Sequence, residues 1–463
     1  MTTPAPRKIL LFLLVWLSAA WFGSWEFNPN NATRLFAAIS LVEDGDARID
    51  EFAPLTIDKA QFDGHVFLDK APGMTLMALP AVALATAVTG ERSTAMPLRF
   101  DDPALGRFLR LRLRLAAASG PALLTAIAAV LLYDLALALT GSAAAALVAA
   151  LGYALGTPAW GWSTTIAGHA AVAALYVIAV WALWQGRGRY ALLGGAALGW
   201  AVVVEYQAVL AGLAIAFWAA WQWRTRLDHR RLLALAAAGG VVALLPLGAY
   251  NQLAFGTPFR IAYAGVQGFE GMQQGLFGLT WPRPRVLLEI LVGDRRGLFW
   301  CAPVLLLAPM GLSLIAERPR TRGLAAVAAA VIAIVLLVNA AYFYWDGGNS
   351  TGPRHAVPLV GLAALGLAAA WQAGGWTRLA IAVLLPVSMA INLMIAAAEI
   401  FAPPEYRWPL WSAVYELRFS RGDLRSWPSE WLGWTPWHGF QLYLAVALPL
   451  LLLLVRSVRR GSS

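Results

Sequence analysis

Apolar segments long enough to cross a lipid bilayer recur along almost the whole chain, from Ile9 to the last turn before Arg456. A bilayer core requires about 17–25 apolar residues per helix. Backbone inside lipid must satisfy its own hydrogen bonds, so such segments fold as helices. Only 13% of the residues are charged and 60% are hydrophobic. The sequence therefore predicts an all-α, polytopic membrane protein.

We expect about twelve transmembrane helices in a single domain that covers residues 1–463. No soluble domain, low-complexity tract or sequence repeat interrupts the pattern. The expected spans are approximately 8–25, 112–136, 143–158, 168–185, 191–204, 207–222, 232–253, 297–316, 322–343, 355–371, 377–398 and 439–456.

The placement of Met74–Val88 decides the orientation of the spans. This stretch is short for a span and contains Pro80, which is more typical of a helix lying in the membrane surface. If it does not cross, the short basic loops fall on the same side as Arg7 and Lys8, as the positive-inside rule requires. Both termini are then cytoplasmic in a plasma (inner) membrane. Residues 26–111 become a long loop on the outer, periplasmic face, with interfacial helices.

Composition excludes two other classes of protein. The single cysteine, Cys301, cannot support a disulfide framework or a cysteine-based metal site. The net charge of +10 is explained by short basic loops that set orientation, so nucleic acid is not an expected partner.

The first external loop concentrates the scarce charges of this chain between Asn28 and Gly73. They are Asp44, Asp46, Asp50, Glu51, Asp58, Asp63 and Asp69, beside Lys59, His65 and Lys70. Lys70 lies at a helix start on the bilayer surface, where its ammonium group can meet a lipid phosphate as a point charge. The alternative is a solvated loop whose acids balance nearby basic residues.

Two helices are expected within that loop. The stretch from Asn31 to Glu43 reads as a short interfacial helix with Asn31 as its N-cap and Gly45 at its end. The segment that contains Asp58 then follows as irregular structure. Pro72 suits the first turn of the next helix, which is the Met74 stretch.

Ionisable residues at the ends of later spans point to the same face. His169 lies at the outer end of a span, and Glu205 interrupts a continuous apolar run from Ala191 to Trp223. A carboxylate there is costly unless it faces water or a partner, so we expect Glu205 and Tyr206 to line a cavity. For His169 the alternative is a satisfied interfacial histidine.

Basic residues beside glycines mark two further turns. Arg295 and Arg296 directly precede a span, where cations are unfavourable for the helix itself and backbone N–H groups favour an anion. We expect them to bind phosphate, the alternative being arginines that extend to the interface. The glycine loop from Trp345 to Arg354 holds Asp346, and its glycines permit close approach of a ligand.

Tryptophan is frequent, with 22 residues. Several fall in the 399–438 loop: Trp408, Trp411, Trp427, Trp431, Trp434 and Trp437. Most are expected to be interfacial belt residues, and at most one or two to stack on a sugar ring.

The order of these elements resembles the GT-C superfamily of glycosyltransferases, near the lipid A aminoarabinose transferases and protein O-mannosyltransferases. The similarity is carried by Thr33-Arg34 in a loop helix, the Gly45-Asp46 helix end, and Asp69-Lys70-Ala71-Pro72 before a surface helix. It covers about residues 8–210 and is architectural beyond them. The resemblance implies a polyprenyl-phosphate sugar donor, a loop carboxylate that assists attack by the acceptor, and a donor phosphate held by the Asp69-Lys70 element.

One departure from that family is informative. Members usually carry an Asp-Glu pair just before the Thr-Arg helix, whereas this chain has Asn30 and Asn31, which cannot act as a base. Asp58 or Asp50 is then the expected base, with Asp69 as a further catalytic candidate, or the protein is not catalytic. A divalent cation would suit the loop carboxylates, but no residue requires one and no metal site is predicted.

These observations predict glycosyl transfer to a lipid, glycan or protein acceptor at the outer face. The rivals are a secondary transporter or lipid flippase, which needs charges at mid-membrane and usually repeats, and a non-catalytic assembly protein. The expected phosphate-binding residues are Lys70, Lys59, Arg295, Arg296 and Arg354. The expected pocket residues are Arg34, His65, His169, Glu205, Tyr206 and Asp346.

Overall fold

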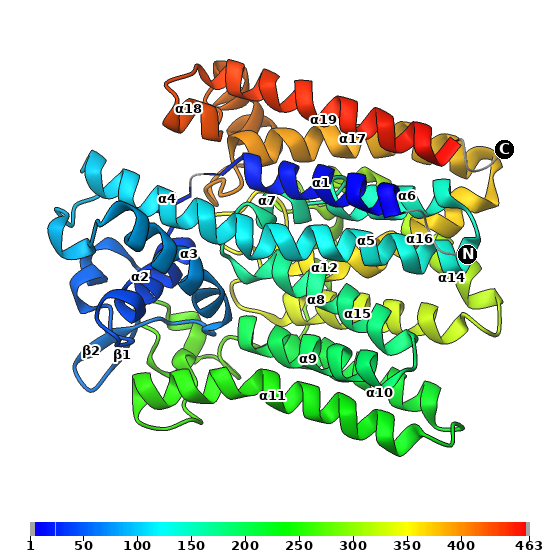
Figure 1. Cartoon of the computed structure of the whole chain (residues 1–463), viewed down its shortest axis with the longest axis horizontal. Coiled ribbons are helices and arrows are strands. Elements are labelled where there is room, and N and C mark those ends of the chain that lie inside the picture. The colour runs from blue at the N-terminus through cyan, green and yellow to red at the C-terminus, as the bar shows by residue number, and fades with distance from the viewer. Residues whose placement is uncertain (1–4, 24, 460–463) are drawn as a thin grey trace.

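The computed structural model describes residues 5–23 and 25–459 of the chain. Long helices run side by side along the longest axis of the molecule, and the segments of the first loop gather at one end of this bundle (Figure 1). The helices of the first half of the bundle are α1 (Ala5–Trp21), α5 (Pro121–Thr140), α6 (Ala143–Ala154), α8 (Gly168–Trp184), α9 (Gly188–Val204), α10 (Ala208–Trp223) and α11 (His229–Phe255). Those of the second half are α13 (Leu298–Cys301), α14 (Ala308–Glu317), α15 (Arg322–Ala341), α16 (Val360–Ala373), α17 (Gly375–Ala398) and α19 (Pro436–Arg459).

The all-α polytopic fold that the sequence predicts is confirmed. Within residues 5–23 and 25–459, six helices are long and apolar enough to cross a membrane, and several shorter apolar helices accompany them. Each expected span overlaps a helix, although the expected span 297–316 is broken into α13, a 3-10 turn (Pro303–Leu307) and α14. Pro303 and Pro309 explain the break, because proline lacks the N–H that a continuous helix needs. The count of twelve stays a prediction.

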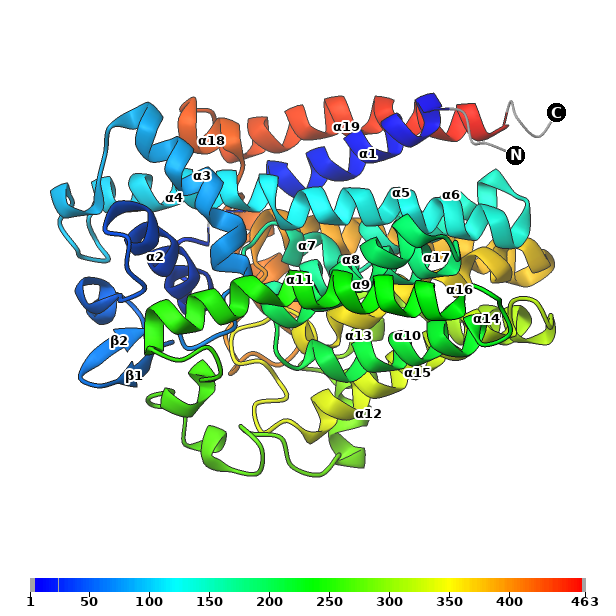
Figure 2. The same cartoon turned by 60° about the horizontal axis from the view of Figure 1, so that its bottom comes forward.

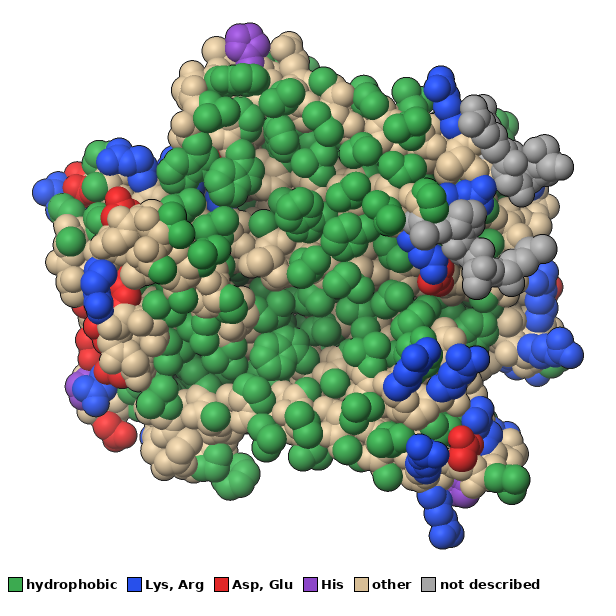
Figure 3. All heavy atoms as spheres, viewed as in Figure 1, with side chains coloured by type: hydrophobic (Ala, Val, Ile, Leu, Met, Phe, Trp, Pro, Cys, Tyr) green, Lys and Arg blue, Asp and Glu red, His purple; other side chains and the backbone are tan. Residues whose placement is uncertain are grey.

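Burial separates central helices from peripheral ones. Nearly every residue of α8 is buried, as expected for a helix that is apolar on all sides. By contrast α11 leaves Val241, Val242 and Leu245 more than half exposed. Figure 3 shows hydrophobic side chains spread over the middle of the molecule in one view. An apolar surface of this extent is one that lipid, rather than water, covers.

The start of α1 and the end of α19 lie together at the end of the bundle opposite the first loop (Figures 1 and 2). There Arg7 donates a hydrogen bond to the carbonyl of Ser457, and Lys8 pairs with Asp134 at 2.6 Å. Lys and Arg side chains gather at this same end in Figure 3. The start of α1 and the end of α19 are therefore on one side, and the positive-inside rule predicts that this side is cytoplasmic.

The first loop folds into three helices, α2 (Pro29–Glu43), α3 (Gly73–Thr89) and α4 (Pro103–Ser119), and α4 is followed directly by α5. The side chain of Asn28, not Asn31, caps α2, and it accepts from the N–H of Asn30. The expected N-cap was wrong because Pro29 favours the first helical position, which moves the start three residues earlier. Asn31 is instead buried, where its side chain contacts the backbone of Trp25 and Ile166.

A β-hairpin stands where irregular structure was expected. Strands β1 (Ala60–Phe62) and β2 (His65–Phe67) pair antiparallel, with Ala60 opposite Phe67 and Phe62 opposite His65. Asp63 and Gly64 form the turn with φ of 52° and 85°. Asp-Gly is the sequence that a tight two-residue hairpin turn prefers, since both positions need positive φ.

The remaining short elements connect the bundle. They are α7 (Ala159–Ser163), α12 (Pro284–Val292), α18 (Trp427–Trp431), a π-helix (Leu410–Glu416), and the 3-10 turns Asp50–Leu55, Ser93–Ala95, Ala262–Gly265, Glu270–Gln273, Arg354–Leu359 and Phe419–Arg421.

Candidate active site

Two carboxylates hold one ammonium group at the base of the hairpin. The Nζ of Lys70 lies 2.8 Å from Asp58 and 2.7 Å from Asp69. Both carboxylates flank the hairpin, since Asp58 lies two residues before β1 and Asp69 lies two residues after β2. Asp69 is buried and the side chain of Lys70 is only 13% exposed. Shielding from water strengthens the attraction between these charges.

The two carboxyl groups of this cluster differ in their affinity for protons. Burial alone would raise the pKa of Asp58, but Lys70, Arg354 and Arg34 outweigh it and hold that pKa below its usual value. Burial raises the pKa of Asp69, and the neighbouring Asp58 charge adds to the effect. Asp58 is therefore the carboxylate that stays ionised, and Asp69 is the one that takes up a proton more readily.

A buried ion pair links the first loop to the bundle. Arg34 of α2 is 1% exposed, and its guanidinium donates to Glu205 at 3.1 Å and to the backbone of Asn30 at 2.8 Å. Glu205 caps the end of α9, so the carboxylate that interrupts the apolar run is paired rather than isolated. A Cβ on Gly168 would lie 2.4 Å from this carboxylate, so any larger residue there would displace the Glu205 side chain.

Arg354 enters the same space from a glycine loop that precedes α16. Its Nε is buried without a hydrogen-bond partner, and within the described part of the chain it forms no ion pair. Gly347 (φ 74°) lies against it, and a Cβ there would come within 2.7 Å of that Nε. A guanidinium without a partner has donors available for an anion.

Arg296 holds that glycine loop in place. It is fully buried, and its guanidinium donates to the backbone carbonyls of Asp346 and Gly348, both at 2.7 Å. Its neighbour Arg295 turns outward and donates to the carbonyl of Pro404. The Asp346 carboxylate accepts from the N–H of Gly348 at 3.1 Å, so it stabilises the same loop.

The acids and bases surround a cavity of about 400 Å³, a size typical of ligand sites. Its lining includes these charged and polar groups. It also includes apolar and aromatic side chains, which we call the aromatic wall: Ile261, Tyr263, Phe269, Met272, Leu276, Phe277, Tyr342 and Tyr344. The cavity thus suits a ligand that carries both a charged group and a large apolar or ring-shaped part.

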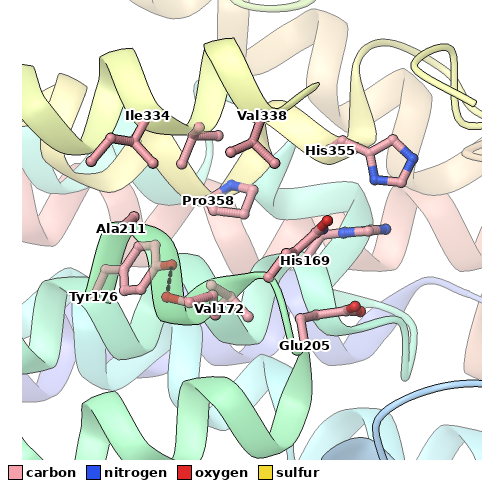
Figure 4. Close-up of a pocket in the computed structure, with 12 residues that line it drawn as sticks. His169, Val172, Tyr176, Glu205, Ala211, Ile334, Val338, His355 and Pro358 are labelled. Carbon is pink, nitrogen blue, oxygen red and sulfur yellow. Dashed lines mark hydrogen bonds between the residues drawn. The ribbon is translucent and has the colours of Figure 1, made fainter. Parts of the chain in front are cut away.

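A narrower apolar recess continues from this cavity between α8, α10 and α15 (Figure 4). Glu205, His169 and His355 lie at its polar end, while Ile334, Ala211 and Tyr176 line it deeper in the bundle. The rings of the two histidines meet edge to face at 5.3 Å.

The structure brings together eight of the residues predicted from sequence. Those that line the cavity are Arg34, Asp58, Asp69, Lys70, His169, Glu205, Tyr206 and Arg354. Their roles stay predictions, but their convergence is the geometry that the sequence led us to expect.

The other predicted residues do not line the cavity. Asp50 and His65 pair with each other at 2.7 Å, with both side chains 42% exposed. Lys59 donates to the carbonyl of Ala53 at 3.1 Å. Arg296 binds backbone carbonyls rather than open space, and Arg295 faces another pocket. Arg296 and Asp346 both contact the glycine loop beside the cavity. The roles that the sequence suggested for these residues stay predictions.

Sequence reasoning missed the aromatic wall and His355. The 254–296 loop carries Tyr263, Phe269 and Phe277, and Tyr342 and Tyr344 precede the glycine loop. Their density in two external loops was a readable signal. In residues 5–23 and 25–459, no group of three or more His, Cys, Asp or Glu side chains is arranged to hold a metal ion.

No known family model matches the sequence, and no curated protein matches it significantly. Two solved structures of similar architecture are crystal structures of ArnT from Cupriavidus metallidurans. The one bound to undecaprenyl phosphate has a TM-score of 0.48 and 15% identity over 85% of this chain and 66% of that chain. The apo structure has a TM-score of 0.47 and 14% identity over 85% of this chain and 70% of that chain. This chain therefore spans about two thirds of the length of ArnT.

Proposed function

We propose that this protein is a glycosyltransferase that uses a polyprenyl-phosphate-linked sugar at the outer face of the membrane. The observation that carries the proposal is the convergence of an ionised carboxylate, Asp58, with Lys70 and Arg354 in one cavity that also has an aromatic wall. A sugar phosphate on a lipid carrier needs each of these features: a base for the acceptor, cations for the phosphate, and apolar surface for the remainder.

In the proposed reaction Asp58 accepts the proton of an acceptor hydroxyl group. The hydroxyl oxygen forms a bond to the anomeric carbon of the sugar, and the bond from that carbon to the phosphate oxygen breaks. The lipid phosphate leaves with the bonding electron pair. Arg354 and Lys70 bind the negative charge that develops on it, because preorganised cations stabilise charge that appears in the transition state.

Asp69 and Arg34 serve as positioning residues in this proposal. Both carboxylate oxygens of Asp69 accept from the Lys70 ammonium group, at 2.9 and 2.7 Å, so Asp69 holds that group at the cavity for the phosphate. Arg34 pairs with Glu205 and thereby ties α2 of the first loop to the end of α9. The Asn30 side chain accepts a hydrogen bond from Arg34, which explains why an amide suffices at that position.

The proposal is tested by the Asp58→Asn variant in purified protein reconstituted in lipid, with radiolabelled polyprenyl-phosphate sugars as donors. Base assistance contributes about 10²–10⁴-fold, so transfer should fall by that factor. Asp50→Asn is the matched control, because Asp50 lies in the same loop but pairs with His65 at the surface. Movement of the lipid across the bilayer without sugar transfer would instead establish a flippase, and unchanged transfer in Asp58→Asn would remove Asp58 from the mechanism.

The pH dependence of transfer gives a second test. Lys70, Arg354 and Arg34 overcome the effect of burial and hold the pKa of Asp58 below its usual value. A carboxylate is ionised above its pKa, so lowering the pH from about 7 to about 5 should leave the base active and the rate level. A steep loss of activity within that window would contradict the assignment of Asp58 as the base.

A further inference from the structure

A second pair of cavities lies behind the glycine loop, outside the site described above. One cavity of about 580 Å³ is polar, and we call it the head compartment; Arg285, Glu289, Asp294, Arg295, Glu405 and Arg407 line it. The other, of about 320 Å³, is aromatic, and we call it the tail compartment; Trp300, Cys301, Met394, Trp408, Trp411 and Tyr415 line it. Asp294 and Arg295 line both, so the two compartments are neighbours.

The aromatic side chains of the tail compartment form two ring pairs. Trp300 and Trp408 meet edge to face with ring centroids 5.0 Å apart, and the ring centroids of Trp411 and Tyr415 lie 4.8 Å apart. Trp411 remains 59% exposed although it faces this cavity. Belt tryptophans are expected to be scattered along the interface, whereas these line a single apolar hollow.

The chain holds this arrangement with specific contacts between two distant segments. The N–H of Trp408 donates to the carbonyl of Asp294 at 3.1 Å, and Arg407 pairs with the Asp294 side chain at 2.8 Å. Trp408 adopts φ of 52°, which is uncommon for a residue with a large side chain. Such conformations persist where surrounding contacts enforce them, and they cluster at ligand sites.

The charges of the head compartment indicate the kind of group that it would bind. Three guanidinium groups are balanced by three carboxylates. An isolated phosphate or carboxylate would favour an excess of cations. Closely spaced donors and acceptors without net charge suit a ligand rich in hydroxyl groups, because a hydroxyl both donates and accepts.

We infer that these compartments bind a glycolipid, with its sugar headgroup among the charged side chains and its hydrocarbon chain against the tryptophans. The inference deepens the proposed function, on which its catalytic meaning rests, because a glycolipid beside the cavity is a candidate acceptor. The glycine loop separates the two sites. Trp345, Thr351 and Gly352 face the new compartments, whereas Gly347, Gly348 and Arg354 face the catalytic cavity.

Photolabelling tests this inference directly. The protein, purified in a detergent without a sugar headgroup and placed in phosphatidylcholine nanodiscs, is labelled with dodecyl glucoside that carries a diazirine on its chain. We expect adducts on residues 298–301 and 408–415. Unlabelled dodecyl glucoside should suppress them at least tenfold more effectively than dodecyl phosphocholine, which has the same chain and a different headgroup.

Two variants test whether the photolabelled adducts form in the head and tail compartments. Trp411→Ala and Arg407→Gln should each reduce the adducts at least fivefold, and both side chains are exposed, so neither change removes core packing. Trp281→Ala is the matched control, since Trp281 is 87% exposed and lines neither compartment. Equal competition by both amphiphiles, labelling elsewhere, or labelling unaffected by Trp411→Ala and Arg407→Gln would overturn the inference.

The photolabelling result and the transferase result can succeed or fail independently of each other. The Asp58→Asn variant should bind the probe normally even though it is expected to lose transfer, because Asp58 lies in the other cavity. Loss of transfer in Asp58→Asn without specific probe binding would leave the glycosyltransferase proposal standing and refute the second site. Specific probe binding without any transfer would support the second site and refute the enzyme.

Discussion

Replacing Arg296 with methionine is expected to release the glycine loop without disrupting the bundle. Methionine replaces the apolar stem of the arginine side chain but cannot donate to the carbonyls of Asp346 and Gly348. Burial lowers the pKa of Arg296 to about 10, so its guanidinium is charged at neutral pH. A hydrogen bond from a charged donor contributes about 1.5–3 kcal/mol. Two of them give roughly 3–6 kcal/mol, and the lower value applies because freed carbonyls can turn to water.

A loss of about 3 kcal/mol raises the population of the open loop by roughly 10²-fold, since each 1.4 kcal/mol is tenfold. Amide hydrogen exchange in nanodiscs measures this population. Peptides from residues 345–354 should exchange about 10²-fold faster, whereas peptides from α8 should not change. Donor affinity should fall in parallel because Arg354 is carried by the same loop.

Arg318→Met is the control for this experiment. Arg318 also donates to a backbone carbonyl, that of Leu139 at 3.3 Å, but it does so far from the glycine loop. The reasoning is refuted if Arg296→Met protein is folded and residues 345–354 exchange at the wild-type rate. The loop would then be held by its own turns rather than by the arginine.

Two further predictions concern the loop glycines and the topology. Gly347→Ala should weaken binding of the sugar donor far more than Gly348→Ala. Both glycines have positive φ, but only at Gly347 would a Cβ approach the Arg354 side chain, to 2.7 Å. Equal losses of donor affinity in the two variants would show that this contact does not matter. The topology is tested with two variants, Asp63→Cys and Leu227→Cys, whose thiols are exposed at opposite ends of the molecule. A membrane-impermeant maleimide added to intact cells should label the Asp63→Cys variant only. Labelling of both, or of the second alone, would contradict the predicted orientation.

Much of the architecture follows from apolar runs alone, because lipid forces each run to form a helix whatever its neighbours do. Glu205 was predictable as a site residue for a related reason. A carboxylate in an apolar run must have a partner, and the structure supplies Arg34. The sequence could not supply the identity of that partner, since it lies 171 positions away along the chain.

The arginines show where sequence reasoning stops. Arg295 and Arg296 looked equivalent as candidates for phosphate binding, yet one is fully buried against backbone carbonyls and the other turns toward the surface. Sequence reports that a guanidinium is available but not which acceptors are already within reach. The hairpin, in contrast, was readable from Asp63-Gly64, a signal of local turn chemistry that a search for helices passed over.

The positions of Asp58 and Asp69 depend on the number of residues in the two strands of the hairpin. Strand pairing has a period of two, so inserting or deleting a single residue in one arm would turn that arm over and separate the carboxylates. Substitutions at the exposed turn leave the count unchanged. Natural variation in this segment should therefore preserve its length more strictly than its chemistry, and an engineered one-residue deletion should be more damaging than any exchange of side chains at the tip.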